Sequence, residues 1–201
     1  SKCDVYVHLH FQVEDKYGNR LRPVFDDIGE AEVGWYTSGN CGDSTPPTNP
    51  TSINPGCTAT SGAWQNTCNN TNFTWSGATD VGSGVAGYYY YWGTSSTGTS
   101  SSYTTSTGYN PPAVSEGTFY FRISTKDNQG NTAPWQTMFI LKYDGTQPTG
   151  FLEINDDIDS TYKTLVSLSP AASDNLSGVA GIRFRDQGGV WTDWQGVSDI
   201  K

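Results

Sequence analysis

The sequence has few charged residues and no long apolar run. Charged side chains make up only 15% of its 201 residues, and 11 Lys and Arg against 20 Asp and Glu give a formal net charge of −9. Nucleic-acid binding rests on Lys and Arg that displace counterions from phosphates, so nucleic acid is not expected as a partner. No run approaches the roughly 18 apolar residues of a membrane-spanning helix, so no membrane span is expected. No signal peptide is recognisable either, so an export signal would lie outside these residues.

Cysteine is confined to the first third of the chain, and its spacing fits no CxxC zinc-binding pair. Two disulfides, Cys57 with Cys68 and Cys3 with Cys41, are the simplest of the three connectivities that four cysteines allow. Both would require an oxidising compartment, which favours an extracellular or cell-surface location.

The composition that remains is typical of an all-β protein. Aromatic residues reach 13%, and Gly, Ser, Thr, Asn and Pro separate short β-prone runs. No helix longer than a turn or two is expected. The clearest strands are predicted at Asn72–Ser76, Tyr88–Trp92, Thr118–Ser124 and Gln136–Tyr143, with a turn over Asp127–Asn131 before the last one.

The two histidines of the chain stand on one predicted strand, Tyr6–Val13, in which apolar and polar residues alternate. His8 and His10 share the polar face, about 6.8 Å apart. That spacing lets one ring bind a metal while the other faces a substrate. A turn over Asp15–Asn19 and a returning strand over Arg20–Phe25 complete a hairpin.

The string HLHFQV, followed by this hairpin and by RPVFDD, resembles the C-terminal end of the lysostaphin-type zinc endopeptidases, which cut peptide cross-bridges in bacterial cell walls. The resemblance implies that His10 is a zinc ligand and that His8 lies beside the metal and assists catalysis. The family's other ligands come from an upstream H-x-x-x-D motif that these residues lack, and a catalytic zinc needs three protein ligands. Zinc is therefore expected only if upstream ligands are present. Two histidines on the polar face of an inactive remnant are the favoured reading.

A Pro-rich stretch from Gly42 to Gly56 marks a domain boundary. The polar loop that follows contains Trp64. A tryptophan in such a loop is a candidate for stacking on a sugar, but a tryptophan that covers its own disulfide is the favoured alternative.

An internal repeat occupies the rest of the chain. Ala78–Gly87 aligns with Ala172–Gly181 at an offset of 94 residues, with seven of ten positions identical, and the lead-in DSTPPT at Asp43 matches DGTQPT at Asp144. A period near 95 to 100 residues is about the size of an immunoglobulin-like sandwich rather than of a solenoid repeat.

The motifs D-x-x-S-G-V, D-N-x-G-N and Y-D-G-T-x-P-T resemble those of Ig-like modules repeated in bacterial surface and secreted proteins. The resemblance implies three parts: a β-hairpin remnant of a peptidase domain (1–42), an Ig-like β-sandwich with a Pro-rich lead-in and a disulfide loop (43–146), and a second, incomplete Ig-like sandwich (147–201). The strands that the second sandwich lacks would come from a longer polypeptide, which is the favoured case, or from another chain.

The repeat also predicts which aromatic side chains face outward. Tyr88 and Tyr90 align with apolar residues of the second copy and are expected in the core, whereas Tyr89 and Tyr91 align with arginines and are expected outside. An outward tyrosine pair on a sheet forms a flat surface that suits sugars or another protein. Strand propensity alone also places tyrosines on sheet surfaces, and this alternative is favoured.

Asp80 and Asp174 recur at one position of the repeat. A calcium site would need at least two acidic ligands, and each loop supplies one. Each of these loops is therefore expected to be a turn held by hydrogen bonds from the backbone to the Asp side chain, and calcium is not expected there. The turn at Asp127 is expected to be held in the same way.

Together these features predict a secreted or cell-surface Ig-like region of a bacterial cell-wall zinc endopeptidase-like protein. It is expected to be non-catalytic and to serve in anchoring or binding, with peptidoglycan, another cell-surface glycan or copies of itself as partners. The alternative is a structural subunit of an extracellular fibre, sheath or adhesin. A carbohydrate-binding module that uses Tyr89, Tyr91 and Trp64 ranks lower.

Overall fold

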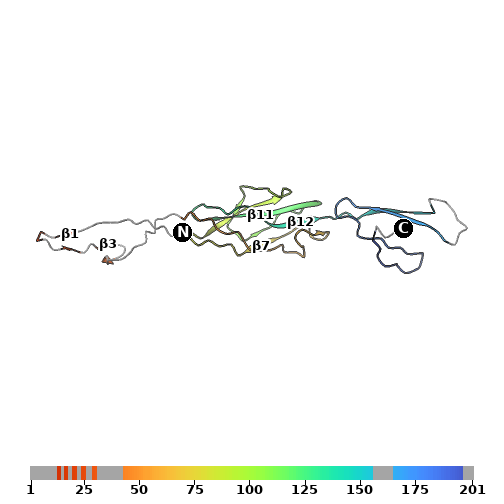
Figure 1. Ribbon diagram of the computed structural model, residues 1–201, viewed down its shortest axis with the longest axis horizontal. Coiled ribbons are helices and arrows are strands. Elements are labelled where there is room, and N and C mark those ends of the chain that lie inside the picture. The colour runs from red at the N-terminus through yellow and green to blue at the C-terminus, as the bar shows by residue number, and fades with distance from the viewer. Residues whose placement is uncertain are drawn as a thin grey trace.

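A computed structural model describes residues 43–155 and 165–196, together with the short segments 13–14, 16–17, 20–21, 24–25 and 29–30. This part of the chain consists of strands, turns and irregular segments with no helix, which confirms the predicted all-β class. Within it, no helix has the length and apolar character that a membrane span requires. Figure 1 shows the strands near the N-terminus, the central strands around β7 (Phe73–Ser76), β11 (Gly117–Asp127) and β12 (Gln136–Tyr143), and the C-terminal segment following one another along the long axis of the molecule.

Short antiparallel ladders occupy the described positions of the first 42 residues. Strand β1 (Val13–Glu14) pairs with β2 (Arg20–Leu21), so the chain turns back between them as the sequence predicts. Strand β3 (Val24–Phe25) pairs with β4 (Gly29–Glu30). Four residues singled out by the sequence lie outside the described residues: Cys3, His8, His10 and Cys41.

Two sheets form a β-sandwich between residues 50 and 143. The smaller sheet has the order β10 (Gly108–Tyr109), β7 (Phe73–Ser76), β5 (Ser52–Asn54). The larger has the order β6 (Trp64–Gln65), β12 (Gln136–Tyr143), β11 (Gly117–Asp127), β8 (Val85–Gly93), β9 (Tyr103–Thr104). Within this sandwich β6 and β12 pair in parallel, and the other strand pairs are antiparallel. Strands β7, β8, β11 and β12 correspond to the four strands predicted from the sequence.

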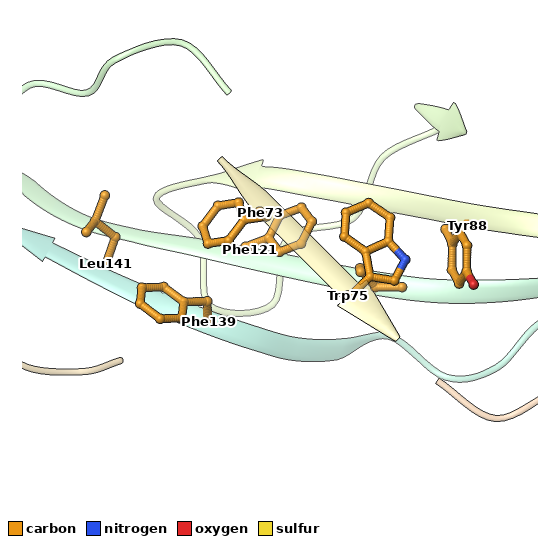
Figure 2. Close-up of a cluster of buried hydrophobic side chains, with 7 residues drawn as sticks. Phe73, Trp75, Tyr88, Phe121, Phe139 and Leu141 are labelled. Atoms are coloured by element: carbon orange, nitrogen blue, oxygen red, sulfur yellow. The ribbon is translucent and has the colours of Figure 1, made fainter. Parts of the chain in front are cut away.

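Aromatic side chains fill the space between the two sheets. On β7 the alternation is strict, because Phe73 and Trp75 are buried whereas the residues that follow each of them are exposed. The Phe73 ring stacks on Phe121 of β11 with 4.5 Å between centroids, and Trp75 meets Tyr88 edge to face at 5.4 Å. Figure 2 shows these side chains in a row with Phe139 and Leu141. Tyr88 belongs to this core and Tyr90 packs against it, as predicted from the repeat.

A disulfide joins Cys57 and Cys68, as the sequence predicts, and closes the loop that contains Trp64. The loop is also tied to the larger sheet, because the Gly62 amide donates to the Ile140 carbonyl at 2.9 Å. Trp64 is therefore held at the edge of the sandwich by strand pairing, by the disulfide and by this bond.

The second repeat contains a two-stranded sheet of β13 (Thr149–Ile154) and β14 (Leu168–Ser173), followed by a bridge between Ile182 and Gln195. Figure 1 shows this segment, in blue, beyond the sandwich. Its apolar side chains are exposed, with 64% for Phe151 and 66% for Trp194. The layer that strands β11 and β12 provide in the first repeat has no counterpart among the described residues of the second.

Truncation of the core residue Phe73 is expected to destabilise the protein strongly. Phe73 has no exposed surface and its ring contacts three other aromatic rings. We expect Phe73→Ala to lower the free energy of unfolding by about 3 to 5 kcal/mol, because a cavity remains where the ring was. Urea titration followed by tryptophan fluorescence measures this. The matched control is Thr74→Ala on the exposed side of β7, for which a change within about 0.5 kcal/mol is expected; equal losses in both variants would contradict the described core.

Candidate functional site

Three aspartates from distant segments meet at one end of the sandwich. Asp43 begins the lead-in to β5, Asp80 follows β7, and Asp127 is the last residue of β11. One carboxylate oxygen from each lies within 4.8 Å of the others. We call these three residues the acidic cluster. It lies at the end of β11 opposite Gly117, which pairs with Tyr143 near the second repeat.

Asp127 has no exposed surface. A register shift between β11 and β8 at Lys126 and Asp127 accompanies its placement, and such irregularities re-aim side chains. Its Oδ1 accepts hydrogen bonds from the amides of Gln129 at 2.9 Å and Asn131 at 2.8 Å. Its Oδ2 accepts one from Asn131 Nδ2 at 2.7 Å. The tight turn requires a residue with positive φ, and Gly130 provides it with φ of 99°.

Hydrogen bonds favour the ionised forms of the Asp127 and Asp43 carboxyls. Burial raises the pKa of the Asp127 carboxyl, but hydrogen bonds from the Asn131 side chain and amide, and from the two preceding amides, lower this pKa further than burial raises it. The amides of Thr45 and then Ser83 lower the pKa of the Asp43 carboxyl. The acidic cluster therefore brings negative charges together at one place.

A glycine makes room for Asp43. The Thr45 amide donates to its Oδ1 at 2.9 Å and the Ser83 amide to its Oδ2 at 3.0 Å. A Cβ atom added to Gly82 would lie only 2.3 Å from Oδ2 of Asp43. The carboxylate can take this position only because residue 82 has no side chain.

One carboxylate oxygen of the cluster is buried without a partner. Oδ2 of Asp80 accepts a hydrogen bond from the Gly84 amide at 2.7 Å, but its Oδ1 is buried and has none. The hydroxyl oxygen of Ser83 is buried as well, and the Ser83 side chain helps to lower the pKa of the Asp43 carboxyl. Leaving a buried polar atom unpaired costs about 1 to 3 kcal/mol, and more for a charged group, so such atoms indicate a missing partner.

The second repeat reproduces part of this arrangement. The amides of Thr146 and Ser177 donate to the two oxygens of Asp144 at 3.2 and 3.0 Å, and the Gly178 amide donates to Asp174 at 2.9 Å. The same three bonds hold Asp43 and Asp80 in the first repeat. Counting carboxylates loop by loop does not reveal this arrangement, because the aspartates that converge come from different loops. The matched lead-ins at Asp43 and Asp144 are the sequence signal that could have revealed it.

A pocket of about 360 Å³ lies at the junction of the two repeats. Trp64 forms part of its wall, with Lys142 Nζ 5.7 Å from the ring centroid. The buried Nε2 of Gln65 beside it has no hydrogen-bond partner. The remaining lining residues are mostly polar: Asn66, Asp144, Gly145, Thr146, Gln147, Pro148 and Ser177.

Tyr89 and Tyr91 occupy the outer face of the larger sheet but are half-buried there. The Tyr89 ring lies 5.2 Å from that of Tyr103, and the Tyr91 hydroxyl accepts a hydrogen bond from the Ser95 amide at 3.1 Å. Two strands, β12 and β11, separate Trp64 from both tyrosines, which is about 14 Å across the sheet alone. The structure therefore does not bring these three predicted binding residues into one site.

Comparison of the chain with protein-family models, curated proteins and solved structures finds no match. The zinc-site residues predicted from the sequence, His8 and His10, lie outside the described residues. The candidate sites that the structure describes are thus the acidic cluster and the junction pocket.

The contact between Asp144 and Ser177 at the junction of the repeats is expected to be sensitive to acid. Hydrogen bonds from the Ser177 side chain, and from the amides of Ser177 and Thr146, lower the pKa of the Asp144 carboxyl. The Asp174 side chain lowers this pKa as well, and together these contacts outweigh the rise that burial causes. A carboxyl with a lowered folded-state pKa contributes stability above about pH 4, and this is lost as the pH falls through the folded-state pKa. We expect the Ser177 amide resonance in NMR spectra to titrate with a midpoint below about 3.9.

The Asp144→Asn chain is the control for this titration, because an amide keeps an acceptor for the Thr146 amide without a titrating charge. Its Ser177 resonance should not shift in this range. A wild-type midpoint at or above the ordinary aspartate value would contradict the described hydrogen bonds.

Proposed function

We propose that this chain is a non-catalytic, Ig-like region of a secreted or cell-surface bacterial protein of the cell-wall zinc endopeptidase type, and that it anchors the protein by binding cell-surface glycan. The observation that carries the proposal is the junction pocket, where Trp64 stands among amide, hydroxyl and carboxylate groups. Peptidoglycan is the glycan that the resemblance of the first 42 residues favours.

The chemistry of the pocket suits a sugar. An indole ring offers an apolar face to the C–H groups of a pyranose, and its neighbours offer hydrogen-bond partners for hydroxyl groups. Gln65 Nε2 is a buried donor without a partner, and a ligand oxygen would satisfy it. A volume of about 360 Å³ lies within the usual range for small-molecule sites.

Two further features support the Ig-like and extracellular parts of the proposal. The first repeat packs two sheets around an aromatic core. Immunoglobulin-like sandwiches have about 100 residues, which is close to the period of the sequence repeat. The disulfide between Cys57 and Cys68 favours an oxidising compartment.

Glycan binding is tested with soluble peptidoglycan fragments titrated into the chain in a calorimeter. We expect Trp64→Ala to weaken binding by about tenfold or more, because the stacking surface is lost. Tyr89→Ala, on the outer face of the same sheet, is the matched control and should bind like the wild type. Circular dichroism establishes that both variants are folded.

Two outcomes would contradict the proposal. If the wild-type chain gives no saturable binding to peptidoglycan fragments, the glycan role fails. If Tyr89→Ala loses binding and Trp64→Ala does not, the outer tyrosine face is the site and the junction pocket is not.

A structural role in an extracellular fibre, sheath or adhesin is the second candidate. It is favoured by the apolar side chains exposed on β13, where Phe151, Leu152 and Ile154 are 64%, 45% and 46% exposed. Exposed apolar strand faces drive association between chains. We expect sedimentation velocity to show assembly that grows with protein concentration and that Phe151→Ser reduces. A monomer at all concentrations would contradict this role for the chain.

A further inference from the structure

We infer that an exposed surface of the second repeat, formed by Arg183, Arg185, Trp191 and Trp194, binds a glycan that carries carboxylate groups. We call these four residues the arginine–tryptophan surface. It shares no residue with the junction pocket, so the inference does not rest on the glycan role proposed for that pocket. The arrangement of the four side chains, their exposure and their charge carry the inference.

The two tryptophan rings hold both guanidinium groups. The guanidinium carbon of Arg183 lies 4.7 Å from the ring centroid of Trp191 and 4.7 Å from that of Trp194. The guanidinium carbon of Arg185 lies 4.8 Å from the Trp191 centroid. All three distances are within the roughly 6 Å of a cation–π contact. Trp191 therefore contacts both positive charges, and Arg183 contacts both rings.

Strand pairing places these side chains on one face. Ile182 and Gln195 form an antiparallel bridge, in which each amide donates to the carbonyl of the other residue at 2.9 Å. Arg183 and Trp194 are the adjacent residues on the two segments. Because side chains alternate along a strand, both point to the face opposite Ile182. Arg183 and Trp194 are exposed, whereas Ile182 is half-buried, in agreement with this alternation.

The first repeat shows which face of the sheet this is. At the repeat offset of 94 residues, Ile182 aligns with Tyr88, which belongs to the core, and Arg183 aligns with Tyr89 on the outer face of the larger sheet. The arginine–tryptophan surface therefore lies on the side away from the core. Strands added at the edge of this sheet would extend it sideways and leave the outer face open.

No carboxylate neutralises the two arginines within the part of the chain that the structure describes. Neither guanidinium group forms a hydrogen bond or an ion pair there, although Asp186 and Asp193 are close in the sequence. Stacking occupies the faces of a guanidinium group and leaves the N–H groups at its edge for an acceptor. Two positive charges against one ring also repel each other, and a bound anion would relieve this repulsion.

The combination of indole rings and guanidinium groups favours an acidic sugar. A carboxylate matches the paired N–H donors of arginine. The Trp194 ring is 66% exposed and offers an apolar face to the C–H groups of a pyranose. A carboxylate brings one negative charge, fewer than a phosphate monoester, so the net charge of −9 opposes it less. Screening beyond about 8 Å at physiological salt lets a local cationic surface act despite this net charge.

The test is calorimetric titration of a galacturonic acid tetrasaccharide into the full 201-residue chain. We expect saturable binding with a dissociation constant of about 0.1 to 1 mM, as a few exposed contacts would give. A neutral galactose tetrasaccharide should bind about tenfold more weakly or worse, because it lacks the carboxylates. Binding of the acidic tetrasaccharide should also weaken as the salt concentration rises.

Two substitutions test the two parts of the surface. Arg183→Gln removes a charged donor, and Trp194→Ala removes the stacking surface without changing the net charge. Each should weaken binding of the acidic tetrasaccharide by about fivefold or more. Lys126→Gln, which removes one positive charge from β11 of the first repeat, is the matched control and should bind like the wild type. Circular dichroism establishes folding, and Arg185→Gln replaces Arg183→Gln if that variant does not fold.

Trp64→Ala separates this inference from the role proposed for the junction pocket, because it should bind the acidic tetrasaccharide like the wild type. The inference is overturned if the wild-type chain shows no saturable binding up to about 10 mM, well above the expected dissociation constant. It is also overturned if the neutral tetrasaccharide or a tetraglutamate peptide binds as tightly as the acidic tetrasaccharide. Wild-type affinity in the folded Arg183→Gln and Trp194→Ala variants would overturn it as well.

Discussion

The buried carboxylate of Asp127 is the constraint around which this end of the sandwich is arranged. A carboxylate with no exposed surface is tolerated only when its oxygens find partners. A turn places the Asn131 side chain against the Asp127 carboxylate, to which its Nδ2 donates a hydrogen bond. The same Asn131 Nδ2 also donates a hydrogen bond to the Asp43 carbonyl. One buried charge thus determines the turn after β11 and the position of the lead-in segment.

The same arrangement at the second lead-in connects the two repeats. Asp144 follows the last strand of the sandwich and accepts a hydrogen bond from Ser177 of the second repeat. The residue therefore belongs structurally to both repeats, as Asp43 belongs to the lead-in and to the loop after β7. Because Asp144 also lines the junction pocket, the contact that fixes the repeats together shapes the proposed glycan site.

The sequence predicts the strands better than it predicts the sites. Alternation and β propensity are local, so β7, β8, β11 and β12 and the inward side of Tyr88 follow from the residues themselves. The acidic cluster does not, because Asp43 and Asp127 are brought together by sheet pairing that no local pattern encodes. Trp64 lines the junction pocket, but strand order separates it from Tyr89 and Tyr91, with which the sequence grouped it, and its binding role stays a prediction. The histidine strand stays a prediction.

The account depends most on whether the junction pocket around Trp64 binds a glycan. The most direct measurement is a two-dimensional NMR titration of the isotopically labelled chain with soluble peptidoglycan fragments. The account predicts saturable shifts that centre on the residues lining the pocket, with Trp64 and Thr146 among them. Shifts absent from the pocket, or shifts that centre on Tyr89 and Tyr91 instead, would contradict it.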